Sequence, residues 1–507
     1  MTTTAPAPTI PTGATARDWV ALVVLMFPVL LVSVDNTVLS LALPELASAL
    51  APTATQQLWM IDAYPLVLAA LLLIMGSLGD RIGRRRLLMV GVTGFAAVSG
   101  LAAFAPSAEL LIAARIGLGF FGAMLMPSTL ALLRTTFLDD AQRRLAIAVW
   151  AATFAAGSAL GPLMGGLLLD ATDWWGVVFL LAVPLLLPVL LLGGRVINES
   201  SSNTPGRLDV VSAILSALTM APIVMAIKRV ATHGPDMFAL ALLVIGLMIG
   251  YVFVRRQRVL GDPMLDVELF SRPAFSVSVL VNLLSMMAMA GFLFFASQHL
   301  QLVIALSPTR AALIMLPGAV AAIIAGLAVV RIVRAVGPRA TVVVGVMITA
   351  VGFAITALAP VPLPAAILLI AFICIGVGVG SAETISNDLV ISSAPPAKAG
   401  SASAVSEMAY EVGALLGTAV LGGIVTAAYR AHLDLPVWVT PQASNAAEQT
   451  LAGALQVAQT LPHDQAVVVA TAARAAFESG VSLTSGLSAL IMVVAAAVAL
   501  IGLRERR

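Results

Sequence analysis

Charged side chains interrupt three very apolar stretches in the first quarter of the chain. Asp35 lies in SVDNTVLSLALP (residues 33–44), Asp62 in QQLWMIDAYPLV and Arg115 in LIAARIGLGFFGA. If these stretches cross a bilayer, a charge near the middle of each costs at least about 2.5–3.5 kcal/mol. At ~1.5 Å per helical residue, all three charges lie about 10–13 Å below the same membrane surface. Contact between the three charges is therefore a reasonable hypothesis, and the free-energy cost of placing them in the bilayer indicates that they have a function.

A second group of acidic residues lies in the last quarter of the chain. Glu383 occurs in GSAETISNDLV, and Glu407 and Glu411 occur in VSEMAYEVGALLG. The spacing of four places Glu407 and Glu411 on one face of a helix. Because burial favours the neutral form of a carboxyl group, such residues can exchange between protonated and charged states. We therefore expect proton transfer to involve Asp35, Arg115, Glu407 and Glu411, although a purely structural ion pair is the alternative for Arg115.

Aromatic residues accompany these charges. Trp59 and Tyr64 flank Asp62, while Trp150 and Phe154 lie one helical turn apart. The face of an aromatic ring attracts organic cations, and quaternary ammonium ligands are commonly bound in this way. Packing against other helices or against lipid is the alternative for each ring. The residues predicted to bind a cationic substrate are Asp35, Asp62, Trp59, Tyr64, Trp150, Phe154, Glu383, Glu407 and Glu411.

Membrane-spanning helices are the elements that must position these side chains. The chain has 507 residues, of which 60% are hydrophobic and 10% charged, and its mean hydropathy is +1.05. A typical soluble domain is about 25% charged. Apolar runs repeatedly reach the ~20 residues that cross the hydrocarbon core of a bilayer. Fourteen spans are predicted, at 18–43, 56–79, 87–105, 108–133, 143–168, 174–194, 208–231, 236–254, 273–296, 309–330, 340–359, 363–390, 401–427 and 480–503.

The fold class is thus an all-α polytopic membrane protein with 14 transmembrane helices. Two six-helix bundles are predicted at 18–194 and 273–503, with an inserted pair of helices at 208–254. The remaining parts are a disordered tail at 1–17, a cytoplasmic linker at 255–272, and a long external loop at 428–479 that is either a helical hairpin or flexible.

The basic residues predict how the chain lies in the membrane. Placing the N-terminus in the cytoplasm puts most of the 27 lysines and arginines in cytoplasmic connections. The positive-inside rule therefore predicts that both termini are cytoplasmic. A weak similarity between GDRIGRRRLLMVG (79–91) and VRAVGPRATVVVG (333–345) favours two related halves, as in many transporters.

Two glycine-containing motifs carry a family resemblance. GSLGDRIGRRR spans residues 76–86, and GSALGPLMGG spans residues 157–166. Glycines permit tight turns and close contact between helices, and Pro162 removes a backbone donor. These motifs resemble the loop signature and the antiporter signature of the major facilitator superfamily. Together with SVDNTVL and WMIDAY, they are similar to its fourteen-helix drug–proton antiporters, the QacA-like and SmvA-like exporters.

That resemblance implies a proton-coupled multidrug efflux antiporter that exports lipophilic cations, such as quaternary ammonium compounds and dyes, by alternating access. It also implies a bacterial inner membrane location, a monomer, and transport that is driven by the proton gradient without any cofactor. Arg115 corresponds to an arginine linked to proton transfer in the family. Conformational roles are implied for Gly76, Asp80, Arg81, Gly83, Arg84, Gly157, Gly161, Pro162, Gly165 and Gly166.

Other functions lack the residues they need. The chain has no phosphate-binding G-x-x-x-x-G-K-[ST] and no hydrolase motif H-E-x-x-H or G-x-S-x-G, so we expect no enzyme. The four histidines are scattered and the chain has a single cysteine, so we expect neither a metal site nor a disulfide framework. The net charge of +2 gives no sign of nucleic-acid binding. The alternatives that stay open are export of an endogenous metabolite, antibiotic or lipid precursor, and a receptor that has lost transport.

Overall fold

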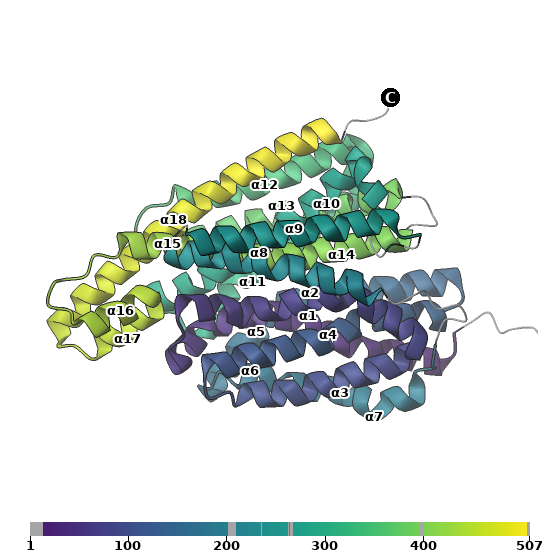
Figure 1. The fold of residues 1–507 in the computed structure, drawn as a ribbon, viewed down its shortest axis with the longest axis horizontal. Helices are drawn as coiled ribbons and strands as arrows, with labels where there is room; N and C mark the ends of the chain where they lie inside the picture. Colours follow the sequence, from purple (N-terminus) through teal and green to yellow (C-terminus); the bar gives the residue numbers. More distant parts are fainter. Residues whose placement is uncertain are drawn as a thin grey trace, which may run out of the picture.

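Long helices run side by side along the whole molecule (Figure 1). The computed structural model describes residues 14–200, 209–234, 236–261, 263, 267–394 and 399–503, and no strand occurs within these ranges. The N-terminal half contains α1 (Ala16–Leu50), α2 (Ala54–Ile82), α3 (Arg84–Ala103), α4 (Ala108–Thr136), α5 (Asp140–Thr172), α6 (Val177–Leu180) and α7 (Ala182–Val196). It is followed by α8 (Val210–His233) and α9 (Met237–Val259).

The C-terminal half contains two short π-helical segments in addition to its long helices. Its elements are η1 (Val267–Ser271), α10 (Pro273–Gln298), η2 (His299–Val303), α11 (Pro308–Val336), α12 (Pro338–Ala357), α13 (Ala365–Ser393), α14 (Ala399–Leu416), η4 (Gly417–Gly422), α15 (Gly423–His432), α16 (Pro441–Gln449), α17 (Leu451–Gln459) and α18 (His463–Gly502). The π segments are η2 and η4.

Twelve helical segments of the described residues are long and apolar enough to cross a membrane, so the all-α, multi-pass prediction is confirmed. The long helices α2 and α5 have 29 and 33 residues and pack among these segments, α2 against α4 and α5 against α1. The count of fourteen spans stays a prediction.

Polar caps and glycines decide where many of these helices begin. Thr15 and Thr53 each form a capping box with the residue three positions later, and Ser107 and Ser307 cap α4 and α11. These side chains bind backbone N–H groups that have no partner within the helix. Long apolar helices therefore start at defined positions despite having little amphipathic pattern.

The packing of the two halves follows one plan. In the N-terminal half α1 packs on α5, α2 on α4, α3 on α4 and α3 on α7. The equivalent pairs in the C-terminal half are α10–α14, α11–α13, α12–α13 and α12–α18. Between the second and third helices of each half stands a glycine with positive φ, Gly83 (104°) and Gly337 (80°). The faint sequence similarity between these two connections thus coincides with equivalent places in the fold.

Hydrogen bonds join the two halves at the end where α1 finishes, which is the predicted external end. Ser297 Oγ donates to the Ser40 carbonyl (2.6 Å), and Gln301 Nε2 donates to the Leu41 carbonyl (2.9 Å). The backbone N–H of Thr309 donates to Asp170 (3.2 Å).

At the same end of the molecule α16 and α17 project beyond the other helices (Figure 1). Gln456 donates to the Ser48 carbonyl near the end of α1, and the backbone N–H of Ala54 at the start of α2 donates to the Gln449 side chain.

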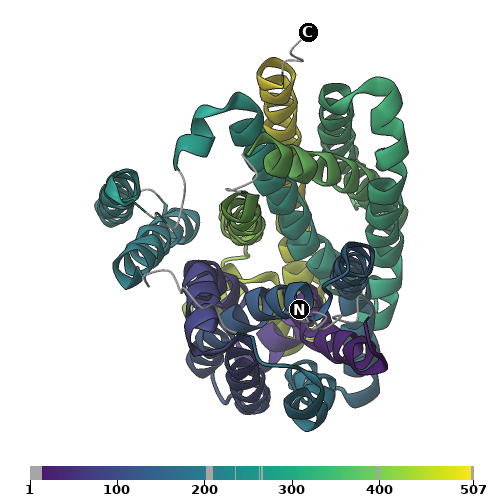
Figure 2. The ribbon, with the colours of Figure 1, turned by 90° about the vertical axis from the view of Figure 1, so that its right-hand side faces the viewer.

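The inserted pair α8–α9 stands beside the two halves, as the end-on view shows (Figure 2). α8 packs against α2 of the N-terminal half and against η4 and α15 of the C-terminal half, while α9 packs mainly against α8. An apolar cluster at this junction includes Leu66 of α2, Val224 of α8 and Leu415 of α14. α8 therefore covers the seam between the halves, and α9 presents its outer face to the surroundings.

Candidate functional site

The centre of the N-terminal half holds an ion pair between α1 and α4. Arg115 Nη1 lies 2.7 Å from Asp35 Oδ2, and their side chains are 2% and 11% exposed. The same guanidinium donates to the backbone carbonyls of Met60 (3.0 Å) and Ile61 (3.4 Å) on α2. The second carbonyl is available because residue 65 is a proline, which has no N–H to offer the residue four positions earlier. Arg115 thus compensates both a buried charge and a break in the α2 hydrogen-bond ladder.

A tyrosine lies against this guanidinium. The Arg115 Cζ atom is 4.6 Å from the ring centroid of Tyr64, whose edge faces Phe95 with a centroid distance of 6.3 Å. Tyr64 is fully buried. A cation over an aromatic face is stabilised by the ring quadrupole, more so when both groups are desolvated. The Tyr64 ring, which the sequence predicts to bind a substrate cation, therefore contacts the protein's own Arg115 guanidinium.

Close helix packing positions this pair. A Cβ atom on Gly119 would lie 2.6 Å from the Tyr64 carbonyl, so only glycine lets α4 approach α2 at this level. A Cβ on Gly161 would overlap the hydroxyl of Thr37 on α1, two residues beyond Asp35. The antiporter-like motif of α5 thus packs directly against the segment of α1 that carries Asp35. Gly157 and Gly165 contact α1 in the same way, Gly166 faces α11, and Pro162 is buried in α5.

Asp62 is fully buried on α2. It follows the two residues whose carbonyls accept hydrogen bonds from Arg115, so it lies near the same level of the half. The structure thus brings Asp35 and Arg115 into contact and holds Asp62 on the neighbouring helix.

The acidic residues of the C-terminal half face the same central region. Glu407 and Glu411 lie one turn apart on α14, which packs against α2, and Glu383 lies on α13. α2 also carries Tyr64, whose ring lies against the Arg115 guanidinium. The Oε1 atom of Glu383 is buried and has no hydrogen-bond partner among the described residues. Two carboxyl groups of the C-terminal half therefore lie on a helix that packs against the helix next to Arg115.

The other three predicted aromatic residues separate into two places. Trp150 and Phe154 stack with a centroid distance of 6.3 Å and an interplanar angle of 13°, and the indole N–H of Trp150 donates to Thr129 Oγ1 (3.2 Å). Both rings are half-buried on α5. Trp59, by contrast, packs into the apolar cluster between α2, α8 and α14. The stacked pair offers a flat aromatic surface, whereas Trp59 belongs to the junction with the inserted helices.

The arginine-rich loop between α2 and α3 is held by a residue that sequence reasoning missed. The carboxylate of Glu199 accepts from the backbone N–H of Arg85 (3.0 Å) and lies 3.7 and 3.8 Å from the Arg85 and Arg86 guanidiniums. The backbone N–H of Arg84 donates a hydrogen bond to the Ser200 carbonyl (2.9 Å). An isolated acid directly after the sixth span was the available signal for this partner.

The rest of this loop has a simple geometry. Gly83 has a φ of 104° and would place a Cβ against the Glu199 carboxylate, so glycine is needed there. Gly76 packs near Pro127 of α4, and Arg81 is exposed. The side chain of Asp80 lies outside the described residues.

A family model described as the Major Facilitator Superfamily matches residues 25–418. The chain belongs to this superfamily. It is therefore a transporter rather than an enzyme. This major facilitator is 52% identical over 496 residues to the multidrug efflux pump LfrA of Mycolicibacterium smegmatis, covering 98% of each chain. It is 34% identical over 483 residues to the methyl viologen resistance protein SmvA of Salmonella typhimurium, covering 94% of this chain and 97% of that one.

A solved structure shares the fold of this major facilitator. It is a bacterial homologue of the human lysosomal transporter Spinster in an inward-facing, unoccupied conformation, with a TM-score of 0.67 and 15% sequence identity. The match covers 98% of this chain and 100% of the other. At this identity the similarity concerns the fold alone.

Proposed function

We propose that this major facilitator exports lipophilic organic cations in exchange for protons. The observation that carries the proposal is the buried Asp35–Arg115 pair, together with the packing of α14, which carries Glu407 and Glu411, against α2. Two relatives bear names that refer to multidrug efflux and to methyl viologen resistance, and methyl viologen is itself an organic cation. Acids within the helical bundle and a stacked aromatic pair suit such a substrate, because cations are attracted by both.

Competition for the carboxyl groups couples the two fluxes in this proposal. A deprotonated Glu407 or Glu411 attracts a cation, and a proton arriving at the same carboxyl group removes that attraction. A proton on Asp35 weakens its hold on Arg115, which then repels the bound cation. Since a ligand shifts a conformational equilibrium only through its different affinity for the two states, exchange of proton and cation drives the conformational change.

The hydrogen bonds that join the halves at the predicted external end support entry of the substrate from the opposite side. Opening to the outside then requires these bonds, such as Ser297 to Ser40, to break. In this proposal the chain crosses a bacterial inner membrane fourteen times with both termini in the cytoplasm, acts as a monomer and uses no cofactor. The proton gradient supplies the driving force.

Everted membrane vesicles with an acidic lumen test the proposal. We expect vesicles containing the wild-type chain to accumulate ethidium, a quaternary cationic dye, and to lose it when the pH gradient is collapsed. Asp35→Asn should abolish accumulation while the protein still elutes as a folded species in size-exclusion chromatography. Asp434→Asn, at an exposed loop position, is the matched control and should transport as the wild type does. Accumulation by Asp35→Asn at the wild-type rate would overturn the proposal.

A further inference from the structure

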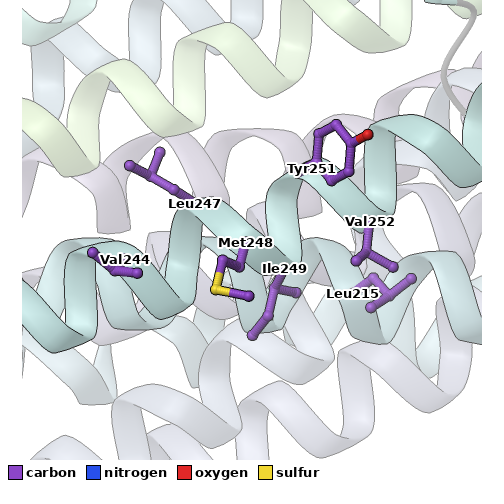
Figure 3. A pocket seen from close by; sticks show the side chains of 7 residues that line it. All are labelled: Leu215, Val244, Leu247, Met248, Ile249, Tyr251 and Val252. Carbon is purple, nitrogen blue, oxygen red and sulfur yellow. The ribbon is translucent and has the colours of Figure 1, made fainter.

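The outer face of the inserted pair contains an apolar groove that the transport site does not use. It has a volume of about 530 Å³ and is lined by Val244, Met248, Tyr251 and Val252 of α9 and by Leu215 of α8, among others. Figure 3 shows the α9 side chains spread along that helix, with Leu215 of α8 also lining the groove. Met248 and Tyr251 are 65% and 68% exposed. On a membrane-spanning helix such exposure means contact with lipid rather than with water.

The groove continues into two arginines on the same face of α9. Val244, Met248, Tyr251, Arg255 and Arg258 follow one another at spacings of three or four residues, which is one stripe of a helix. Arg255 and Arg258 are exposed at the end of α9 that is predicted to be cytoplasmic. An apolar channel thus ends at two positive charges near the membrane surface.

A different arginine neutralises the nearby acid. Arg256 Nη2 lies 2.9 Å from Asp209 at the start of α8, and its Nε donates to Ser212 (3.1 Å). Arg256 points toward α8 in this way, and the charge of Asp209 is balanced. Arg255 and Arg258 are exposed and form no ion pair with any acid among the described residues, so their charges are available where the groove ends.

The dimensions of the stripe fit a phospholipid. From Val244 to Arg255 the rise along α9 is about 16 Å at 1.5 Å per residue. One leaflet of the hydrocarbon core is about 15 Å thick, half of the ~30 Å of the whole core. We propose that the α8–α9 groove binds an anionic phospholipid of the cytoplasmic leaflet, with its phosphate at Arg255 and Arg258 and an acyl chain along Val244, Met248 and Tyr251. Basic pockets next to membrane helices bind anionic headgroups by this electrostatic attraction.

Native mass spectrometry of the full-length protein, titrated with phosphatidylglycerol or phosphatidylcholine of identical acyl chains, tests the site. We expect the wild type to bind phosphatidylglycerol more tightly. Each arginine near an anionic headgroup contributes about fivefold in affinity, so Arg255→Gln/Arg258→Gln should weaken phosphatidylglycerol binding roughly 25-fold, with little effect on phosphatidylcholine.

The matched control is Arg331→Gln/Arg334→Gln, two exposed arginines with the same spacing at the corresponding end of α11. This control should retain wild-type binding of both lipids. Met248→Trp, which fills the groove, should weaken the binding of both lipids because it displaces the chain. Equal losses in the two double variants, or no preference for phosphatidylglycerol in the wild type, would overturn the proposal. Undiminished binding by Met248→Trp would contradict the placement of the chain.

Discussion

The two halves share a packing plan but treat buried charge in different ways. In the N-terminal half Asp35 is bound to Arg115 at 2.7 Å. In the C-terminal half Glu383, Glu407 and Glu411 lie on α13 and α14, whose described residues include no lysine or arginine. A paired carboxylate is stabilised as an anion, whereas a half-buried acid that forms no salt bridge within the described part of the chain is more readily neutralised by a proton or by a bound cation. In the proposed mechanism the Asp35–Arg115 pair holds one conformation, and the C-terminal acids exchange protons for cations.

Removing Arg115 should have the largest effect. Arg115→Met leaves Asp35 as a buried charge and leaves the Ile61 carbonyl without its donor, and breaking a buried pair in this way costs about 3–5 kcal/mol. We expect loss of transport and an unfolding transition at clearly lower temperature in detergent, detected through the reactivity of the single cysteine, Cys374.

The double variant Arg115→Met/Asp35→Asn sharpens this test. It should recover much of the thermal stability, because the orphaned charge is gone, but it should not recover transport. If the double variant is as unstable as Arg115→Met alone, the two residues do not act as a pair.

The packing that positions Asp35 should be the next most sensitive feature. Gly161→Ala places a methyl group where the Thr37 hydroxyl lies, so α1 must shift against α5. Overpacking of this kind typically costs about 1–3 kcal/mol, and we expect slower ethidium transport together with a lower unfolding temperature.

The control for this variant is Gly100→Ala. No atom lies within 4 Å of a Cβ at Gly100, so that substitution should be neutral or should stabilise α3 by about 0.5–1 kcal/mol. Identical behaviour of the two alanine variants would remove the steric argument for the α1–α5 contact.

Substitution of the C-terminal acids should have the opposite effect: it should weaken ligand binding and leave the stability of the protein unchanged. Glu411→Gln replaces a half-buried acid by a neutral amide of similar shape, which lowers the cost of partial burial. We expect about tenfold weaker ethidium binding, equivalent to ~1.4 kcal/mol, with an unfolding temperature equal to or above that of the wild type. A marked loss of stability in Glu411→Gln, comparable to that of Arg115→Met, would erase the difference between the halves.

The smallest effect concerns the stacked aromatic pair. Thr129→Val removes the hydroxyl that accepts from the Trp150 indole while preserving side-chain shape, and one neutral hydrogen bond contributes about 0.5–1.5 kcal/mol. We expect ethidium affinity to fall by a few-fold and Trp150 to be less restrained, measured as fluorescence anisotropy in a chain whose other tryptophans are replaced by phenylalanine. Unchanged affinity would show that the orientation of Trp150 is not important for binding.

Sequence reasoning predicted the helices and the depth of the charges better than their directions. Counting 1.5 Å per residue placed Asp35 and Arg115 at one level, and they are in contact. Depth does not fix the rotation of a helix, so the packing of Trp59 at the junction with α8 could not be predicted, and its role in substrate binding stays a prediction. The role of Pro65 was also missed, because the carbonyl it frees on Ile61 finds its partner on another helix.

The contribution of Glu199 was not predicted. Its partner Arg85 lies 114 residues away, on the loop between α2 and α3. Which arginines meet a given acid depends on how α3 and α7 pack, and nothing local in the sequence records that packing. The apolar groove of α8–α9 could not be predicted either, because a spanning helix is apolar on nearly every face and the sequence does not distinguish one face from another.

Proton release upon cation binding tests the central claim most directly. When ethidium is added to the purified protein in weakly buffered solution, a pH-sensitive dye should report protons released in proportion to the cation bound. Apparent affinity should rise with pH, because the neutral carboxyl groups that prevail at low pH attract the cation less. Glu407→Gln/Glu411→Gln should release far fewer protons, and Asp434→Asn should behave as the wild type. Binding of ethidium by the wild type without any proton release would contradict the account.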